Sequence, residues 1–442
     1  MRILEWQLLD EDARRAALAR PTQRTSSVVS AGVREIIASV RRDGDAALRL
    51  LTTCFDHVEL DELAVTAAEI AAARRALSAK QHAALERAID NVHTFHAAQD
   101  PSPLVLETMP GVRCERLVRP ISAVGLYAPA GSAPLPSTVI MLAVPARIAG
   151  NPTRVLCTPP DRDGRANNAI LVAAALCGVR EIFKIGGAQA IAALAYGTAT
   201  VPKVDKIFGP GNVWVTAAKQ AVASDPDGAA CDLPAGPSEV LIIADDSVRP
   251  EVIAADLLAQ AEHGPDAQAI LVTASRAVGS AVADAVEKQW QDLSRRMILE
   301  QSLKTSRCIL VPDWRAALRV ANDYAPEHLI LAVREPRRWL AAVANAGSVF
   351  LGAWSPEALG DYCSGTNHVL PTFGYARAYS GLSVLDFVKR ITVQEISAAG
   401  LRALGPTAVT LAQLEGLDGH ADSVTRRLAL LERAAVAETA SS

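Results

Sequence analysis

The sequence predicts an α/β protein built around two doubly wound parallel sheets, and three observations support this prediction. From about residue 121, short apolar runs alternate with segments of helical periodicity, which is typical of parallel strands covered by helices on both faces. The alternation forms two series, separated by the proline- and glycine-containing loop 234–237. The chain has 442 residues, which is too long for one ordinary core, so at least two domains are expected.

The first hundred or so residues have a helical pattern. Residues 33–42 carry apolar side chains at helical spacing, and Thr66 with Glu69 has the spacing of a capping box that opens a further helix. Another helix is expected over about 80–98, and it carries three histidines: His82, His93 and His96. We interpret all three as solvated residues of the helix face with no part in function.

Strands and helices then follow in a regular order. The first series of expected strands covers 123–127, 154–158, 181–185 and 204–208. The second series covers 239–244, 269–273, 308–311, 328–332 and 348–351. A helical pattern returns after about residue 384, over 393–403, 407–415 and 423–435. Four parts result: an N-terminal helical segment (1–118), a first α/β domain (119–236), a second α/β domain (237–384) and a C-terminal helical segment (385–442).

Composition and charge exclude several classes of function. Half of the residues are hydrophobic and 21% are charged, which is the balance of a packed globular protein. The net charge of −4 gives no electrostatic signal for nucleic acid or for an anionic membrane. The seven cysteines are scattered, and the N-terminus carries acidic residues where a signal peptide would carry basic ones. We therefore expect a cytoplasmic protein with reduced thiols and without nucleic-acid or membrane partners.

Two glycine turns follow strands of the first series and open helices. The first is Gly186-Gly187 and the second spans 209–211. A strand, a glycine turn and a helix together bring backbone N–H groups to a phosphate, although the G-x-G-x-x-G dinucleotide motif is absent. Taken alone, each turn is better explained as simple turn chemistry. Two turns on successive strands favour a nucleotide cleft at the carboxyl edge of that sheet.

The loop 232–239 combines prolines with a hydroxyl and a carboxylate, those of Ser238 and Glu239, where it enters a strand. Because proline fixes the backbone, the loop could aim these small polar groups at a ligand. The alternative is an inter-domain linker.

Several residues of the second half have the side-chain types of a zinc site that keeps room for a substrate. Gln260 and His263 are three residues apart at the end of an expected helix, and therefore on one face. Asp361 and His368 flank a Ser-Gly-Thr-Asn turn, and His420 supplies a further imidazole. A pair with such spacing is often a surface coincidence, and sequence alone does not establish that these regions converge.

Glu327 and His328 stand at the entrance of an apolar strand. Burial raises the pKa of a glutamate, so that it can act as a base near neutral pH. A satisfied strand-edge pair is the alternative interpretation. The entry into an apolar strand favours a function in proton transfer.

With these segments in view, the sequence resembles the histidinol dehydrogenase family over nearly its whole length. The most specific stretches are 125–138, 186–195, 206–212, 235–239, 260–266 and 360–371. The resemblance implies two Rossmann-like domains with smaller helical parts. It also implies oxidation of L-histidinol to L-histidine through L-histidinal with two NAD, the last steps of histidine biosynthesis.

The resemblance further implies roles for individual residues. One zinc ion per subunit would be bound by Gln260, His263, Asp361 and His420. NAD would contact Tyr127, Gln189 and Asn212. The substrate would meet Ser238, Gln260, His263, His328, Asp361, Glu415 and His420, with His368 nearby. His328 would be the base for alcohol oxidation, and Glu327 would activate water for aldehyde oxidation.

The family also forms homodimers in which the C-terminal region completes the partner's active site, which would place Glu415 and His420 across the subunit boundary. Related enzymes oxidise other polar alcohols by the same proton chemistry, so the substrate-facing residues decide between them. A zinc hydrolase is disfavoured because no His-Glu-x-x-His helix is present. A non-catalytic NAD-binding protein would be expected to lack Glu327 or His328, and both are present.

Overall fold

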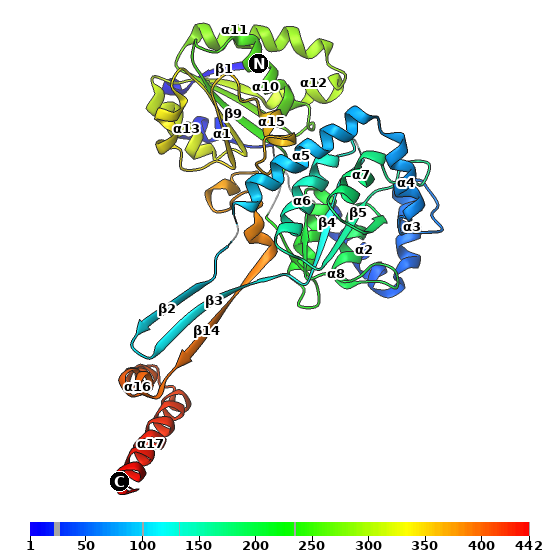
Figure 1. Ribbon diagram of the computed structural model, residues 1–442. Coiled ribbons are helices and arrows are strands. Elements are labelled where there is room, and N and C mark those ends of the chain that lie inside the picture. The colour runs from blue at the N-terminus through cyan, green and yellow to red at the C-terminus, as the bar shows by residue number, and fades with distance from the viewer. Residues whose placement is uncertain (22–26, 100, 132, 234–235, 442) are drawn as a thin grey trace. The chain divides into compact units, whose positions relative to one another are not determined.

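The computed structural model describes residues 1–442 except 22–26, 100, 132, 234–235 and 442 (Figure 1). The first two residues of the predicted loop 234–237 therefore lie outside the described part. Residue contacts divide the chain into two compact units. Unit 1 comprises Met1–Asp100 and Ile121–Phe387, and unit 2 comprises Pro101–Pro120 and Val388–Ser442. Among the described helices, none has both the length and the apolar character needed to cross a membrane.

The first sheet of unit 1 has five parallel strands in the order β6-β5-β4-β7-β8. The strands are β4 (Ala123–Tyr127), β5 (Thr153–Thr158), β6 (Glu181–Lys184), β7 (Lys206–Phe208) and β8 (Ala230–Cys231). The four strands predicted for the first series are thus confirmed as neighbours in one sheet. The edge strand β8 was not predicted, because its two residues are too few to give a sequence pattern.

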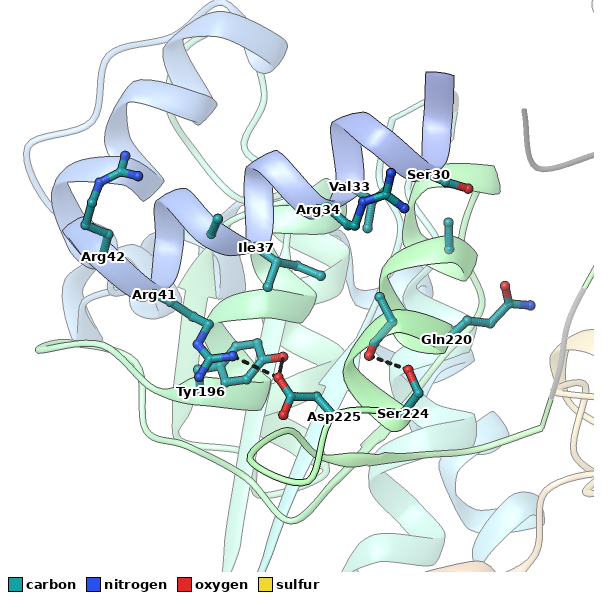
Figure 2. A pocket seen from close by; sticks show the side chains of 13 residues that line it. Ser30, Val33, Arg34, Ile37, Arg41, Arg42, Tyr196, Gln220, Ser224 and Asp225 are labelled. Atoms are coloured by element: carbon teal, nitrogen blue, oxygen red, sulfur yellow. Dashed lines mark hydrogen bonds and ion pairs between the residues drawn. The ribbon is translucent and has the colours of Figure 1, made fainter. Parts of the chain in front are cut away.

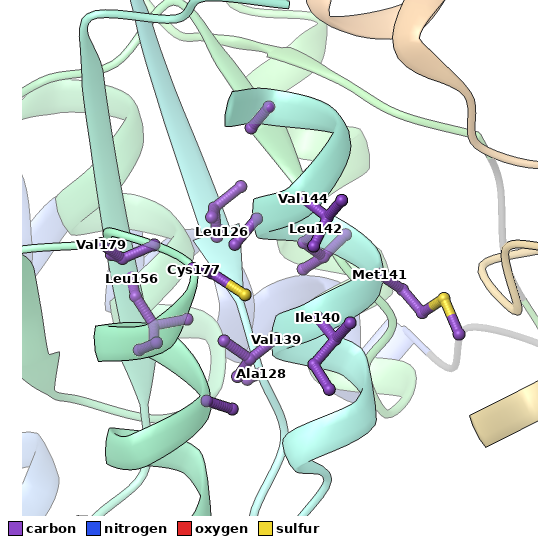
Figure 3. Packing of buried hydrophobic residues seen from close by; sticks show 14 of the residues in the cluster. Leu126, Ala128, Val139, Ile140, Met141, Leu142, Val144, Leu156, Cys177 and Val179 are labelled. Carbon is purple, nitrogen blue, oxygen red and sulfur yellow. The ribbon is translucent and has the colours of Figure 1, made fainter. Parts of the chain in front are cut away.

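Helices cover both faces of this sheet, because successive side chains of each strand point to opposite sides. One face packs against α4 (Ala67–Ala76), α5 (Ala79–Ala97), α6 (Pro136–Ile148) and α7 (Asn168–Leu176). The other packs against α2 (Ser27–Asp43), α3 (Asp45–Asp56), α8 (Gly187–Tyr196) and α9 (Val213–Ala223). Figure 3 shows the first face, where Val139 and Leu142 of α6 lie near Leu126 and Leu156 of the sheet.

The second sheet of unit 1 has six parallel strands in the order β1-β11-β10-β9-β12-β13. They are β1 (Arg2–Glu5), β9 (Glu239–Ala244), β10 (Gln268–Thr273), β11 (Arg307–Leu310), β12 (His328–Ala332) and β13 (Ser348–Leu351). The helices of this region are α1 (Glu11–Leu18), α10 (Pro250–Ala261), α11 (Arg276–Gln289), α12 (Arg296–Thr305), α13 (Trp314–Tyr324), α14 (Pro336–Trp339) and α15 (Glu357–Tyr362). Two buried clusters line the two faces, so the doubly wound α/β prediction is confirmed for this region as well.

Unit 2 is built around a three-stranded antiparallel sheet in the order β14-β3-β2. Its elements are β2 (Leu104–Met109), β3 (Val112–Pro120), β14 (Val388–Ile396), α16 (Ala398–Leu414) and α17 (Asp418–Ser441). The two helices pack on each other. Short 3₁₀ turns elsewhere in the chain are η1 (Trp6–Leu8), η2 (Trp290–Asp292), η3 (Leu340–Ala342), η4 (Tyr375–Arg377) and η5 (Val384–Phe387).

The terminal parts differ from the prediction of two helical segments. The range 1–118 also contains β1, which pairs with β11, and the strands β2 and β3. The expected helix 393–403 is wrong over its first residues, because Val388–Ile396 is a strand paired with β3 along its whole length. Valine, isoleucine and threonine favour a strand once a partner strand is available. The expected break near Pro406 is also absent, and α16 continues through this proline.

Of the three histidines expected on a solvated face, His96 was interpreted wrongly. His96 is 0% exposed, its Nδ1 lies 2.9 Å from the carbonyl oxygen of Val92, and its Nε2 lies 3.3 Å from the side-chain nitrogen of Asn367. His93 is exposed and His82 is partly exposed. The capping box at Thr66 and Glu69 is confirmed at the start of α4.

Candidate active site

A cluster of buried polar groups lies at the amino edge of the six-stranded sheet, where β9 and β12 begin side by side. Glu327 and His328 enter β12, and both side chains are buried. The backbone N–H of Glu239 donates to Glu327 Oε2 over 2.9 Å, which fixes this carboxyl group against the start of β9. The predicted Glu-His pair is therefore located inside the molecule and next to the entrance of the neighbouring strand.

Three carboxyl groups surround the His328 ring. Its Nδ1 lies 3.7 Å from Glu327 Oε2 and 3.8 Å from Glu357 Oε1, and its Nε2 lies 3.4 Å from Asp361 Oδ1. Despite this neighbour, Nε2 is buried without a hydrogen-bond partner among the described residues. This nitrogen is consequently free to exchange a proton with a bound molecule.

Burial and charge shift the pKa values of this cluster strongly. Burial raises the pKa of Glu327 to about 8, and burial likewise raises the pKa of Glu357 to about 8. Burial alone would lower the pKa of His328, but Glu357, Glu327 and Asp361 together raise it to about 10. A base must be neutral, so this set of residues needs an additional positive charge nearby before His328 can take up a proton at neutral pH.

The amide of Gln260 lies between this cluster and His263. Gln260 ends α10, and its side chain is 0% exposed. Both ends of the amide find suitable partners when its nitrogen faces inward, where it donates to Glu357 Oε1 over 2.8 Å and to the carbonyl oxygen of Glu239 over 3.3 Å. The opposite amide atom is then the oxygen, and it lies 3.4 Å from His263 Nδ1.

His263 lies beside the outer atom of the Gln260 amide, and Asp361 lies beside His328. His263 follows α10 and is exposed, and its Nδ1 lies 3.0 Å from the carbonyl oxygen of Ala259, which leaves Nε2 with its lone pair available. Burial alone would raise the pKa of Asp361, but the imidazoles of His328, His368 and His263 around it lower it. Gln260 thus contacts His263, and Asp361 is close enough to His263 for the imidazole to influence its pKa.

His368 is held in place close to these groups. Its Nδ1 donates to the carbonyl oxygen of Asp361 over 2.7 Å, and its Nε2 lies 3.3 Å from Thr138 Oγ1. Burial lowers the pKa of His368, so the ring is neutral at physiological pH. Its expected place near the substrate site is consistent with these contacts.

Glu415 and His420 belong to unit 2. Glu415 caps the C-terminus of α16, His420 lies in the first turn of α17, and both are exposed. Of the four predicted metal ligands, Gln260, His263 and Asp361 belong to unit 1 and His420 belongs to unit 2.

The residues predicted to contact a nucleotide lie at the carboxyl edge of the five-stranded sheet. Tyr127 ends β4, and its hydroxyl accepts a hydrogen bond from Gly187 N over 3.1 Å. Burial raises the pKa of Tyr127 to about 12. Gln189 is buried in the first turn of α8, and Asn212 caps α9 through hydrogen bonds from Trp214 N and Val215 N.

The second glycine turn is locked by a buried ion pair. Gly209 N donates to Asp232 Oδ2 over 2.7 Å, and Lys219 Nζ donates to the Gly209 carbonyl over 2.9 Å and pairs with the other Asp232 oxygen. Gly209 has φ +127°, and a Cβ at this position would lie 2.2 Å from the carbonyl oxygen of Tyr127. Only glycine allows this close approach, so the turn and the end of β4 form one rigid element.

Glu239, where the predicted loop enters β9, has a structural role. The guanidinium of Arg20 forms an ion pair with Glu239 at 2.5 Å, and the hydroxyl of Tyr324 donates to the same carboxylate over 3.0 Å. Ser238 is partly exposed beside it. Glu239 is thus committed to a buried network, whereas Ser238 retains access to a ligand.

Glu357 is the member of the cluster that the sequence interpretation missed. It is 0% exposed and precedes Asp361 by four residues, so both lie on one face of α15. His328, Glu357 and Asp361 offer ligand atoms within 4.8 Å of one another. The i, i+4 spacing of two carboxylates was the available sequence signal, but no pattern indicated that the first of them is buried.

A surface groove of about 860 Å³ lies between α2 and α9, and none of the predicted site residues lines it (Figure 2). Three of its polar side chains pair with one another. Arg41 and the hydroxyl of Tyr196 both donate to Asp225 Oδ2 over 2.8 Å, and the Arg41 guanidinium lies 4.5 Å from the centre of the Tyr196 ring. The groove offers no reactive group, so the chemistry is assigned to the buried cluster.

Comparison with known proteins decides the family. A model of the histidinol dehydrogenase family matches residues 18–428. The chain belongs to the histidinol dehydrogenase family. It is 55% identical over 428 residues to the histidinol dehydrogenase of Xanthomonas campestris pv. campestris (strain 8004), covering 97% of this chain and 99% of the relative. It is 54% identical over 428 residues to the Vibrio parahaemolyticus enzyme, covering 97% of this chain and 98% of the relative.

A solved histidinol dehydrogenase has the same fold. The crystal structure of the enzyme from Elizabethkingia anophelis superposes with a TM-score of 0.94 at 43% sequence identity, covering 98% of this chain and 99% of that chain. The resemblance inferred from the sequence motifs is therefore confirmed. The protein is an oxidoreductase of the histidinol dehydrogenase type that belongs to histidine biosynthesis and acts on a small molecule, histidinol.

Proposed function

We propose that the protein catalyses the zinc- and NAD-dependent oxidation of L-histidinol to L-histidine in two steps, through L-histidinal. The observation that carries the proposal is the buried Glu327–His328 pair beside Asp361. Each oxidation requires one proton acceptor. The alcohol must lose its hydroxyl proton in the first step, and water must lose a proton as it adds to the aldehyde in the second. The pair supplies two acceptors at one place.

The ligand atoms of this site fit zinc. Gln260 Oε1, His263 Nε2 and the Asp361 carboxylate would hold the ion, and His420 would complete a set of four ligands. The set shared by His328, Glu357 and Asp361 fits less well. Glu357 faces Nδ1 of the His328 ring and Asp361 faces Nε2, so the two carboxylates do not approach the same nitrogen. Bound zinc supplies a fixed point for the nitrogens of histidinol, so that the reacting carbon stays in place through both steps.

His328 acts as the base for the alcohol. Its buried Nε2 has no hydrogen-bond partner among the described residues and is the atom that we assign to take up the hydroxyl proton. The ring must be neutral for this task. A cation held by Asp361 would lower the pKa of His328, because it would occupy a carboxylate that otherwise raises that pKa.

Glu327 acts in the second oxidation. Its carboxyl group has a pKa raised by burial to about 8, which suits the removal of a proton from water near neutral pH. The hydrogen bond from Glu239 N holds one carboxyl oxygen and leaves the other for water. Ser238 would contact the substrate from the adjoining loop.

NAD would bind at the carboxyl edge of the five-stranded sheet, beside Tyr127, Gln189 and Asn212. Bound NAD accepts the hydride that each oxidation releases, and two NAD are consumed per histidinol. The first turn of α8, which no side chain of its N-cap residue caps, offers backbone N–H groups for its phosphates. Because the oxygen of the Asn212 side chain already caps α9, its NH₂ group is the part available to the cofactor.

The test is the amount of NADH formed per L-histidinol consumed, before chelation, after chelation and after zinc is added back. Two NADH per substrate, lost on chelation and restored by zinc, are expected. One NADH per substrate would contradict the two-step reaction, and activity only on another polar alcohol would change the substrate while keeping the proton chemistry.

We also propose a homodimer in which Glu415 and His420 of one subunit complete the site of the other. The E327Q and H420N variants should each be inactive in the full reaction. An equal mixture of the two variants, after the subunits exchange, should regain about a quarter of the wild-type activity, since half of its dimers are mixed and each mixed dimer carries one intact site of two. Mixed dimers without any activity would argue against a shared site.

A further inference from the structure

The amide of Gln260 has two side-chain neighbours at its inner end. One is His328, whose Nδ1 lies 3.1 Å from the inner amide atom and can donate to an oxygen or accept from a nitrogen there, according to its tautomer. The other is Glu357, whose two carboxyl oxygens lie 2.8 and 3.2 Å from the same atom and favour a nitrogen. Of these two side chains, Glu357 is therefore the one that distinguishes between the two ends of the amide.

The orientation of the amide decides which atom Gln260 presents to His263. With its nitrogen inward, the amide donates to Glu357 and to the carbonyl oxygen of Glu239, and its oxygen points outward. With its oxygen inward, the outward atom is an NH₂ group, which has no lone pair for a metal ion. Glu239 accepts through a backbone carbonyl that every variant retains, so Glu357 is the side chain that determines the orientation of the Gln260 amide.

Glu357 is placed to act through Gln260. It lies on α15 one turn before Asp361, and α15 packs against α10, which carries Gln260. The contact between Glu357 and Gln260 thus joins the two helices that supply ligands. Groups that orient a ligand in this way usually change metal affinity by ten- to a hundredfold when they are removed.

We propose that Glu357 is a positioning residue that holds the Gln260 amide with its oxygen directed toward the zinc site. This inference rests on the zinc site proposed above. Without an acceptor at position 357, the amide nitrogen loses its closest inner partner and the amide can turn its oxygen inward. The metal then loses one ligand while every ligating residue is still present.

The test compares zinc affinity in two neutral variants of nearly equal size, by competition with a chromophoric chelator. Glu357→Leu removes the acceptor, and its zinc affinity should fall by about ten- to a hundredfold. Glu357→Gln removes the charge but keeps an acceptor oxygen, and its affinity should stay within about threefold of the wild type, because the hydrogen bond to Gln260 is retained. The difference between the two variants isolates the acceptor from the charge.

A second comparison asks whether Glu357 acts through Gln260. In the Q260A background, E357L should lower zinc affinity no further, because the ligand that Glu357 orients is already gone. Cobalt substituted for zinc gives an independent readout. The visible absorption of the cobalt-loaded E357L protein should match that of cobalt-loaded Q260A, since both lack the same ligand.

Three results would overturn the positioning role: wild-type zinc affinity in E357L, a loss in E357Q as large as that in Q260A, or additive losses in the double variant. If E357L does not fold, E357Q and Q260A alone decide between these outcomes. A wild-type protein that binds no zinc would refute the proposed metal site itself, whereas zinc binding that is insensitive to position 357 would refute only this inference.

Discussion

The two parallel sheets of unit 1 have the same architecture but carry their polar groups at opposite edges. In the five-stranded sheet, Tyr127 and the two glycine turns follow the carboxyl ends of the strands. In the six-stranded sheet, Glu327 and His328 precede the strand that they introduce, and Gln260 ends a helix at that same amino edge. Ligands of open α/β sheets usually bind at carboxyl edges, so the second sheet departs from the common arrangement.

Helix polarity explains the difference. The N-termini of α8 and α9 lie at the carboxyl edge of the first sheet and favour negative charge, such as phosphate groups. The C-terminus of α10 lies at the amino edge of the second sheet and favours positive charge. The proposed anionic cofactor at one edge and the proposed metal cation at the other would therefore each meet a helix end of opposite sign. The same fold thus provides two chemically different sites according to which edge is used.

The largest expected effect is that of a substitution at the amino edge, which should slow proton transfer without affecting cofactor binding at the carboxyl edge. Glu327→Gln should lower the rate of histidinal oxidation by about 10² to 10⁴, while the oxidation of histidinol to the aldehyde falls much less. The KM for NAD should stay unchanged. Stopped-flow measurement of NADH from each substrate checks this, and equal losses in both steps would end the assignment of separate roles.

A substitution at the other edge should have the reverse pattern. Lys219→Met leaves the buried Asp232 without its partner, so we expect a loss of about 3 kcal/mol in the free energy of unfolding and a roughly tenfold higher KM for NAD. Zinc affinity should not change. Urea unfolding, NAD titration and chelator competition measure the three quantities. Lys203→Met, on the same domain but exposed, is the matched control and should alter none of them.

A buried carboxyl group near the amino edge, that of Asp256, should make the free energy of unfolding depend on pH. Burial raises the pKa of Asp256, on α10, from 3.8 to about 6. The folded state holds this proton more tightly than the unfolded state, so its contribution to stability is lost as the pH rises from about 4 to about 6. Asp256→Asn should remove roughly 2 kcal/mol of this loss, measured as the difference between unfolding free energies at pH 4 and pH 7. Equal pH dependence in both proteins would show that Asp256 ionises freely in the folded state.

The smallest expected effect concerns the cap of α9. Asn212→Ala should lower the free energy of unfolding by about 1 kcal/mol, because two backbone N–H groups lose their acceptor. Asn212→Asp keeps the acceptor and should restore stability, but its negative charge should weaken NAD binding. An Asn212→Asp variant with unchanged KM for NAD would place the cofactor away from this helix end.

The sequence predicted secondary structure best where a single local pattern was enough to identify a strand. Strands β4, β9, β12 and β13 were predicted with the bounds that the structure has, because buried parallel strands are short apolar runs between turns. Strand β14 was missed because its residues also fit a helix, and its partner β3 lies far away in the sequence. Tertiary pairing overrides such weak local preferences.

For the site, the sequence indicated ligand types and the Glu-His pair, but not their environment. The burial of Glu357 and the inward nitrogen of Gln260 depend on how α10 and α15 pack, which local spacing does not encode. His96 was misjudged for the same reason, since its partner Asn367 comes from a distant segment. Roles of individual residues came from the family resemblance, and the contacts of unit 1 now give physical reasons for several of them.

The sheet of unit 2 has a consequence for the order of events during synthesis. Strand β3 leaves the ribosome long before β14, and until then it is an unpaired edge that could associate with other chains. Ile121 N donates to the carbonyl oxygen of Phe387 over 3.0 Å, so the folded segment 121–387 holds its own two ends together. The two strands then start side by side, with Pro120 opposite Val388, and little loop-closure entropy opposes their pairing. Unit 2 is therefore expected to form last, as a fast step that reports completed folding of the segment between its two halves.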